Sequence, residues 1–336
     1  MQIFKSQEPK KWDEWLIQVG QSCFGQSWHW GEILSSEGYQ VERLLIWEDE
    51  VVLAQAQIIY HILPLGIKYA FCPQGPIFSS QSNASLKVQT MIALSQYLRR
   101  QNCVFFRLEP SGSALEAIKS EPFFKTKKTS DINPRATVIL DLTVESQNIL
   151  NNFKSKTRYN IKLAEKKGVK MTEKKDLKVF MRLSQATAKR DGFRLHPASH
   201  YEQVLLSPLS RQFSAVYEDK EIATIILAGF GQGLTYLYGA SDYNYRHLMA
   251  PYFLQWQALI WGKKTGYHYY DFLGIAPGRV IDGQYDYDSA HRYAGVTRFK
   301  TGFGGQIQIK PGTFDMIFNS FKYIFYKLSR KIRRFF

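Results

Sequence analysis

The sequence predicts an α/β (α+β) protein built from two domains of one kind, each a mixed sheet flanked by helices. Two internal similarities support this fold class. The first joins Leu45–Ile58 (LIWEDEVVLAQAQI) with Ser214–Leu227 (SAVYEDKEIATIIL). Each segment has apolar runs on either side of an acidic turn, at Glu48-Asp49 and at Glu218-Asp219, and this pattern is typical of a β-hairpin.

The second similarity joins Tyr97–Leu108 (YLRRQNCVFFRL) with Trp261–Phe272 (WGKKTGYHYYDF) at nearly the same separation. Each segment has a helix end with two basic residues, a turn at Asn102 or Gly266, and an aromatic-rich strand. Two matches at one separation indicate a duplicated unit of hairpin, helix and strand, against the alternative that common hairpins match by chance. The length of 336 residues, more than one core usually holds, agrees with two domains.

The charge balance indicates a polyanionic partner. Lys and Arg number 44 and Asp and Glu number 29, which leaves a formal net charge of +15. Folding does not require such an excess, and both nucleic acid and anionic lipid attract it.

Cysteine usage and hydropathy favour a cytoplasmic protein. Cys23, Cys72 and Cys103 form no CxxC pair, which favours a reducing compartment and argues against a zinc site, so we expect no metal. Met1–Lys11 is polar and does not resemble the start of a signal peptide. No run of the sequence approaches the roughly 18 apolar residues of a membrane span.

A basic helix is predicted over Gln147–Lys167. Its core-facing positions are Ile149, Leu150, Phe153, Ile161 and Ala164. Its other faces carry one acid, Glu165, and the cations Lys154, Lys156, Arg158, Lys162, Lys166 and Lys167. Such a face is either simply solvated or follows a phosphate backbone, and both interpretations stay open.

The segment Phe318–Phe336 predicts an amphipathic helix without acidic residues. Its apolar positions are Phe321, Ile324, Phe325, Leu328, Ile332 and Phe335. Its cations are Lys322, Lys327, Arg330, Lys331, Arg333 and Arg334. We expect Phe318, Phe321 and Phe325 to pack on the first domain and Lys327–Phe336 to lie in a membrane interface.

One loop of the second domain lacks the glycines that a pyrophosphate requires. Tyr243–Pro251 (YNYRHLMAP) connects a strand over Leu234–Ala240 to a helix that begins near Tyr252. Coenzyme A is normally held by close backbone N–H groups at such a helix N-terminus. An acyl donor bound there is therefore expected to be something other than coenzyme A.

A series of short motifs runs along nearly the whole chain. They are, in order, Gln26–Gly31 (QSWHWG), Gly75-Pro76, Phe106–Pro110 (FRLEP), the basic helix Phe153–Lys162, Thr187–Phe193 (TAKRDGF), Tyr238–Ser241 (YGAS), Ala250–Trp256 (APYFLQW), Tyr270–Ile275 (YDFLGI) and Phe299–Gly305 (FKTGFGG). In this order they resemble the FemABX non-ribosomal peptidyltransferases, which build peptidoglycan interpeptide bridges. The chain is similar to the short kind, because it has no heptad run of ~40–60 residues.

The resemblance implies tandem GCN5-related N-acetyltransferase-like domains, with the C-terminal helix returning to the first. We expect domain 1, on the precursor side, over residues 1–145 and 318–336, and domain 2, on the aminoacyl-tRNA side, over residues 146–317.

The resemblance also implies a reaction. An amino acid moves from aminoacyl-tRNA to a side-chain amine on the stem peptide of a peptidoglycan precursor, lipid-linked or nucleotide-linked, and the membrane-binding tail favours the lipid-linked one. The aminoacyl ester is already activated, so we expect neither a covalent nucleophile nor a cofactor. The reaction requires an unprotonated amine and stabilisation of the oxyanion and of the departing ribose oxygen. We expect a monomer bound peripherally to the cytoplasmic face of the membrane.

Two catalytic residues follow from the same resemblance. Lys300, beside the glycines of Phe299–Gly305, stands at the family's lysine position, with an ordinary surface lysine before a glycine turn as the alternative. Glu109 stands where the family often has an aspartate proposed as general base, although a structural carboxylate at a strand end is the favoured role here.

Among the remaining site residues, Tyr201 and Tyr252 match aromatic positions of the family, Arg194 and His196 lie close in sequence to a family arginine position, and the tRNA-binding candidates come from the basic helix. The candidates for substrate binding are Tyr201, Tyr252, Arg194, His196 and Trp30, and those for tRNA binding are Lys154, Lys156, Arg158 and Lys162. Two departures are present: Pro197 replaces an arginine of the family, and Gly31–Ser36 lacks a cation that the family often has.

Two other function classes remain as alternatives. A coenzyme-A-dependent N-acyltransferase acting on another cell-surface polymer is disfavoured by the missing glycine loop. A non-enzymatic basic module that binds RNA or membranes explains the charge but not the Lys300 motif.

Overall fold

The computed structural model describes residues 1–332, and the chain divides into two compact units. Unit 1 begins at Met1 and ends at Arg135, and it resumes at Lys310; unit 2 is Ala136–Ile309. The expected boundaries lay after residues 145 and 317. They differ from the observed ones because the strand Ala136–Asp141 belongs to unit 2 and the strand Phe314–Ile317 belongs to unit 1. Residues 333–336, with Arg333, Arg334 and Phe335 of the predicted tail helix, lie outside the described part of the chain.

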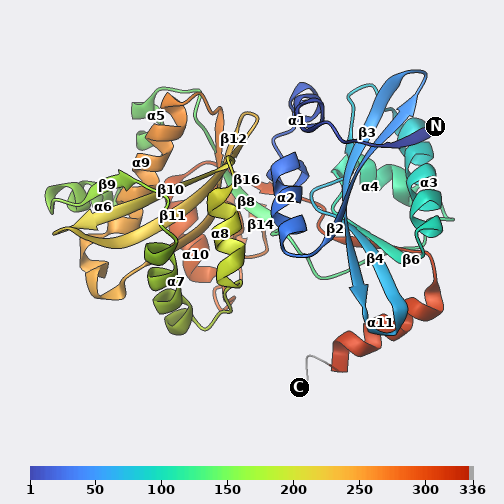
Figure 1. The fold of residues 1–336 in the computed structure, drawn as a ribbon. Coiled ribbons are helices and arrows are strands. Elements are labelled where there is room, and N and C mark those ends of the chain that lie inside the picture. The colour runs from blue at the N-terminus through green and yellow to red at the C-terminus, as the bar shows by residue number, and fades with distance from the viewer. Residues whose placement is uncertain (333–336) are drawn as a thin grey trace. The chain divides into compact units, whose positions relative to one another are not determined.

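Unit 1 is an eight-stranded mixed sheet with helices on both faces (Figure 1). The strand order is β1-β2-β3-β4-β6-β17-β7, with β5 paired to β3, and the β4–β6 pair alone is parallel. Its elements are β1 (Gln2–Lys5), α1 (Pro9–Gln18), η1 (Phe24–Gln26), α2 (Trp28–Ser36), β2 (Gln40–Glu48), β3 (Val51–Leu63), η2 (Pro64–Gly66), β4 (Ile67–Cys72), β5 (Ile77–Phe78), α3 (Ala84–Arg100), β6 (Cys103–Leu108), α4 (Gly112–Lys119), β7 (Thr126–Lys128), β17 (Phe314–Ile317) and α11 (Ser320–Ile332).

Unit 2 is a seven-stranded mixed sheet in the order β16-β8-β13-β12-β11-β10-β9, with a separate β14–β15 hairpin. Here the β12–β13 pair alone is parallel. Its elements are β8 (Ala136–Asp141), α5 (Ser146–Asn151), α6 (Ser155–Lys166), β9 (Lys170–Glu173), α7 (Leu177–Asp191), α8 (Ala198–Leu206), β10 (Ser210–Tyr217), β11 (Lys220–Phe230), β12 (Gly233–Ser241), η3 (Tyr243–Leu248), α9 (Ala250–Lys264), β13 (Tyr269–Asp271), β14 (Gly278–Ile281), β15 (Gln284–Tyr287), α10 (Ala294–Lys300), η4 (Thr301–Phe303) and β16 (Gln306–Ile309).

The two sheets repeat one plan, which confirms the predicted duplication. In both, a hairpin and a third strand lead through a long helix, α3 or α9, to a parallel strand whose other neighbour is antiparallel. Both hairpins turn on two residues with positive φ, Asp49 and Glu50 in one and Glu218 and Asp219 in the other. The first turn therefore lies one residue beyond the predicted Glu48-Asp49.

One strand in each sheet comes from the other half of the chain. β17 lies between β6 and β7 of unit 1 but follows all of unit 2 in sequence. β8 takes the equivalent place between β13 and β16 of unit 2 but follows directly on unit 1. These two strands account for the difference from the expected boundaries, because sequence order assigned each of them to the wrong sheet.

Helices cover the two faces of each sheet. In unit 1, Phe106 of β6 packs toward α3, whereas its neighbour Phe105 packs against Tyr323 and Tyr326 of α11, as alternation along a strand requires. In unit 2, α5, α6 and α9 build the main core, and α7 and α8 lie across the other face of the sheet (Figure 1).

The predicted basic helix is two helices, α5 and α6. The break falls at Asn152–Lys154, where the Lys154 N–H leaves the helical pattern and donates to the Gly302 carbonyl (2.9 Å). The expected core positions are correct, since Leu150 is half-buried and the others are buried. The polar segment Phe123–Pro134 contains the short strand β7, which pairs with β17.

The C-terminal helix packs through a different face from the predicted one. Tyr323 and Tyr326 are 4% and 2% exposed, whereas Phe321 and Phe325 are 71% and 50% exposed. Phe318, the third predicted anchor, is half-buried. The tyrosines face inward because their hydroxyls form hydrogen bonds with a buried ion pair. A phenylalanine has no hydroxyl and could not form them.

That ion pair joins β6 to β17. Arg107 donates twice to the Asp315 carboxylate (2.7 and 2.9 Å), and both side chains are almost fully buried. Tyr323 Oη donates to Asp315 (2.8 Å), and Arg107 donates to Tyr326 Oη (3.1 Å). A buried charge pair needs its remaining lone pairs and protons satisfied, and the two tyrosines do this.

Candidate active site

The second unit has a local irregularity at its parallel strand pair. β12 and β13 pair only over Gly233–Thr235 and Tyr269–Asp271, although β12 continues to Ser241. A register shift in the β11–β12 pairing also places Tyr236 and Tyr238 opposite successive residues of β11. The two tyrosines therefore lie on opposite faces of the sheet, since successive positions alternate between faces.

Lys300 lies where these strands diverge. It is the final residue of α10 and is 7% exposed. Its Nζ donates to the carbonyl oxygens of Leu273 (3.1 Å) and Gly274 (2.8 Å), directly after β13. An ammonium has three N–H donors, and these two bonds use two of them. The structure thus shows a buried lysine rather than the surface lysine of the alternative.

Asp271 shapes the turn that holds Lys300. Its Oδ1 accepts hydrogen bonds from the Leu273 N–H (2.7 Å) and from Thr137 Oγ1 on β8. Leu273 has a φ of 55°, a conformation that costs about 1 kcal/mol or more in a residue other than glycine and persists only where its surroundings impose it. The bond from Leu273 to Asp271 stabilises this turn, which aims two carbonyls at Lys300.

Burial changes the acidity of the lysine. It lowers the pKa of Lys300 from 10.5 to about 7, and the charge of Asp271 acts in the opposite direction. The Lys300 Nζ also lies 5.4 Å from the ring centroid of Tyr236. An amine with a pKa near 7 can hold a proton and give it up at neutral pH, which is what general acid–base catalysis requires.

The glycines after Lys300 have a structural explanation. A Cβ at Gly302 would lie 2.7 Å from Thr157 Oγ1, and one at Gly304 would lie 2.6 Å from the Asn152 carbonyl oxygen. Gly304 and Gly305 also have positive φ, 72° and 86°. Gly304 lets the Lys300 segment pack closely on the α5–α6 break, Gly302 lets it pack on the first turn of α6, and Gly305 lies against β8. Packing within unit 2 is therefore sufficient to explain them.

The same contact places the start of the basic helix beside the Lys300 segment. Lys154, Lys156 and Lys162 are exposed, so three of the four predicted tRNA-binding cations are available. Arg158 is half-buried and donates to the carbonyls of Asn151 (3.2 Å) and Phe153. Its guanidinium is thus partly used to satisfy backbone carbonyls at the C-terminal end of α5.

Tyr252 belongs to the Lys300 neighbourhood, whereas Tyr201 does not. The Tyr252 ring packs edge-on against Phe299, with centroids 4.9 Å apart, and stacks on Phe303. Tyr201 is buried on the α7–α8 side of the sheet, against Phe180 and Tyr238.

One further predicted binding residue, His196, lies near Tyr201. The Tyr201 hydroxyl accepts from the His196 N–H (3.2 Å), and the His196 ring stacks on His200. His200 Nε2 lies 2.8 Å from the Tyr238 hydroxyl. Arg194 is exposed. Tyr201, His196, His200 and Tyr238 therefore form a second cluster, separated from Lys300 by the sheet.

The other predicted site residues lie in unit 1. Trp30 is half-buried and packs edge-on against Phe24, 4.8 Å between centroids. The Glu109 carboxylate accepts from the Gln74 N–H (2.9 Å), from the N–H and side-chain amide of Asn133 (2.9 and 2.6 Å), and from Thr313 Oγ1 (3.0 Å). This geometry supports the structural role for Glu109.

The sequence reasoning missed Asp271, Thr137 and Tyr236. Asp271 lies in the quoted motif Tyr270–Ile275 but was given no role. An acid that follows an aromatic strand and precedes the Leu-Gly turn was the available signal; Thr137, 134 positions away from Asp271, offered none.

Within the described residues, no cluster of three or more His, Cys, Asp or Glu side chains could hold a metal ion. The described helices are also too short or too polar to cross a membrane.

The fold and the site together define a class of protein. The two repeated mixed sheets are tandem GCN5-related N-acetyltransferase-like domains, and the second holds a buried lysine where its parallel strands diverge. The fold is similar to that of a tandem N-acetyltransferase protein from the clavulanic acid biosynthesis pathway, with a TM-score of 0.51 and 8% identity over 94% of this chain and 98% of that one.

Sequence and structure comparisons identify the family. The FemAB family pattern matches residues 8–124, 122–207 and 209–331, so the chain belongs to the FemAB family and is a transferase. The lipid II:glycine glycyltransferase of Staphylococcus saprophyticus is 22% identical over 370 aligned residues, 87% of each chain. The crystal structure of FemX matches with a TM-score of 0.83 and 19% identity, covering 97% of this chain and 99% of that one. The resemblance seen in the motifs is confirmed.

Proposed function

We propose that the protein transfers an amino acid, glycine first among the candidates, from aminoacyl-tRNA to a side-chain amine on the stem peptide of a lipid-linked peptidoglycan precursor. The name of its staphylococcal relative supports the glycyl group and the lipid-linked acceptor. The observation that carries the proposal is Lys300, a buried amine that is held by two carbonyls and has a pKa near neutrality.

The reaction forms a C–N bond and breaks an ester C–O bond. The acceptor amine attacks the aminoacyl carbonyl carbon, and negative charge develops on the carbonyl oxygen. Collapse expels the ribose oxygen, which takes a proton, while the new amide nitrogen loses one. The remaining N–H of the Lys300 ammonium can stabilise the oxyanion and protonate the ribose oxygen. A pKa near 7 then lets Nζ recover a proton released from the amide nitrogen.

The exposed lysines at and near the start of α6 supply positive charge that can bind the aminoacyl-tRNA. Lys156 and Lys162 project from α6, and Lys154 lies directly before it, at the end of the helix that contacts the Lys300 segment. Phosphates attract such cations without sequence preference. A tRNA acceptor end that follows these lysines would therefore bring its aminoacyl ester toward Lys300.

The coenzyme-A alternative is disfavoured by the backbone before α9. Pro251 has no N–H, and the Tyr252 N–H already donates to the Met249 carbonyl (3.0 Å). Two of the groups that would bind a pyrophosphate at this helix N-terminus are thus missing or occupied.

The test is a transfer assay with the purified protein, a mixture of charged tRNAs, and lipid-linked or nucleotide-linked precursor, followed by mass spectrometry of the product. A mass increment of one glycine on the lipid-linked precursor is the expected result. Acyl-coenzyme A in place of tRNA should give no product. A product with acyl-coenzyme A, or none with any charged tRNA, would overturn the proposal. A gel shift that compares charged with uncharged tRNA would then show whether the protein only binds RNA.

A further inference from the structure

Helix α11 has two opposite faces with different surroundings. Tyr323 and Tyr326 attach one face to the sheet of unit 1. The other face is apolar and open to solvent. Its residues and their exposed fractions are Phe321 (71%), Ile324 (57%), Phe325 (50%) and Leu328 (53%). Single exposed apolar side chains are normal, but four adjacent ones on one helix face mark an interaction surface.

The charges of α11 fit an anionic partner. Among residues 320–332 there is no acid. At 3.6 residues per turn, Lys322 and Lys327 lie about 110° to either side of the centre of the apolar face. Their long stems let the ammonium groups reach toward the plane that this face would contact. Flanking cations beside aromatic and aliphatic side chains are the pattern of a helix that lies in a membrane interface.

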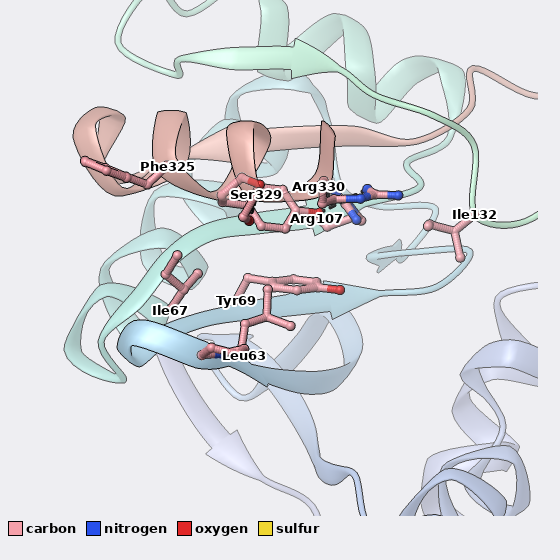
Figure 2. Close-up of a pocket in the computed structure, with 10 residues that line it drawn as sticks. Leu63, Ile67, Tyr69, Arg107, Ile132, Phe325, Ser329 and Arg330 are labelled. Atoms are coloured by element: carbon pink, nitrogen blue, oxygen red, sulfur yellow. Dashed lines mark hydrogen bonds between the residues drawn. The ribbon is translucent and has the colours of Figure 1, made fainter. Parts of the chain in front are cut away.

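A cavity beneath the helix continues the apolar surface. It has a volume of about 400 Å³ and lies between α11 and the β3–β4 hairpin, as Figure 2 shows. Phe325 borders it at one end, and Leu63, Ile67 and Tyr69 line it from the hairpin. Arg330 lies toward the other end, which Ile132 borders. Apolar walls with a cation at one end suit a molecule that has both a hydrocarbon chain and an anionic group.

We infer that α11 is a docking surface for an anionic lipid bilayer. Phe321, Ile324, Phe325 and Leu328 enter the interfacial layer, while Lys322 and Lys327 face lipid phosphates. The buried tyrosines hold the helix on unit 1, so membrane contact requires no detachment of α11. This inference differs from the sequence-based expectation in the residues that meet lipid, because Phe321 and Phe325 were expected to pack inward.

The binding test uses the full chain and co-sedimentation with two kinds of vesicle, phosphatidylcholine with 30% phosphatidylglycerol and phosphatidylcholine alone. The double variant Phe321→Ser/Leu328→Ser should lower partitioning onto anionic vesicles at least tenfold, because each lost side chain removes apolar area from the interface. Leu206→Ser is the matched control, since Leu206 is 70% exposed on α8; it should bind as the wild type does.

The charge test separates lipid electrostatics from apolar adhesion. Lys322→Glu/Lys327→Glu should weaken binding to anionic vesicles by tenfold or more, at about 1 kcal/mol for each lysine lost, and should hardly change the weak binding to neutral ones. Equal binding of the wild type and both double variants to anionic vesicles would overturn the inference. So would micromolar self-association of the wild type that the serine variant abolishes, because the face would then contact a second copy of the chain.

The inference can fail separately from the proposed function. Vesicle binding is measured without tRNA or precursor, so its loss in the variants stands even if no aminoacyl transfer is found. Conversely, transfer to a soluble stem-peptide acceptor without vesicles should be equal in the wild type and in Phe321→Ser/Leu328→Ser. Far-ultraviolet circular dichroism and the melting temperature confirm that the variants remain folded.

Discussion

At the scale of single residues, the resemblance located the lysine but not its environment. Lys300 could be named from Phe299–Gly305 because the motif is continuous in sequence. Asp271 lies in the equally continuous motif Tyr270–Ile275 but was given no role. Thr137 could not be named, since it meets Asp271 only when β8 pairs with β13. The space beside the glycines is filled by Asn152 of the α5–α6 break, by Thr157 of α6 and by residues of β8. A sequence motif shows that small residues are required, and only packing shows what they contact.

We predict that Lys300→Ala abolishes transfer without unfolding the protein. Loss of a donor that stabilises a developing oxyanion typically lowers kcat by about 10²–10³-fold. Lys264→Ala, which changes an exposed lysine of α9, should retain wild-type kcat and serves as the control. Substantial kcat in the Lys300 variant, measured with charged tRNA and precursor, would remove the catalytic assignment.

Lys300 also predicts a pH dependence of stability. Its pKa is about 7 in the folded protein and near 10.5 otherwise. Between these values the unfolded chain binds the extra proton, so the free energy of unfolding rises with pH by up to about 1.4 kcal/mol per pH unit. Lys300→Met should lack this rise. Urea unfolding of both proteins between pH 7 and 10 checks it, and parallel curves for the two would show that Lys300 titrates normally.

Asp271→Asn should impair the reaction through the turn that positions Lys300. The asparagine can still accept from the Leu273 N–H, so the fold should persist, but the negative charge that raises the pKa of Lys300 is lost. The expected result is a lower kcat with a nearly unchanged KM for the acceptor. The apparent pKa of the rate profile should shift downward. A loss of kcat without that shift would assign Asp271 a purely structural role.

At the scale of elements, amphipathic patterns gave correct helices but not always their breaks or orientations. The predicted core positions of the basic segment were right although the helix is interrupted, because a three-residue break preserves the buried side. The predicted buried face of α11 was wrong. The prediction rested on the spacing of the phenylalanines, and the sequence does not show that two residues from distant strands form a buried ion pair beneath the helix. Buried Arg107 and Asp315 select the tyrosines, and the phenylalanines are left outside.

The exposed lysines of α6 predict electrostatic binding of tRNA. Lys154→Glu/Lys156→Glu should weaken binding and make its dependence on salt shallower by about one to two in the logarithmic slope, because fewer counterions are released. Lys178→Glu/Lys189→Glu places the same charge change on α7, across the sheet, and should leave the slope unchanged. An unaltered slope in the α6 variant would favour the interpretation that this face is merely solvated.

At the scale of the whole molecule, the sequence predicted the number and kind of domains better than their boundaries. The duplicated segments gave the repeated plan because they lie inside each sheet. The boundaries depend on β8 and β17, short strands whose place is set by pairing partners far away in sequence. Local pattern cannot specify such a partner, because the same strand could close either sheet.

The pair between Arg107 and Asp315 predicts how strongly unit 1 depends on β17. Asp315→Ala leaves a buried guanidinium without its counter-charge and should cost about 3–5 kcal/mol. Tyr323→Phe removes one hydrogen bond to the same carboxylate and should cost about 1 kcal/mol. Denaturant unfolding with fluorescence measures both. Similar small losses in the two variants would mean that the pair contributes little beyond packing.

The position of β17 in unit 1 also has a consequence for protein synthesis. A ribosome that has completed the first 135 residues must still translate Ala136–Ile309 before β17 emerges. At about 5–20 residues per second this takes roughly 10–35 s. During that interval β6 has an open edge and Arg107 has no counter-charge. The nascent first unit is therefore the stage at which this enzyme needs protection from aggregation, and it becomes complete only after the second unit has been made.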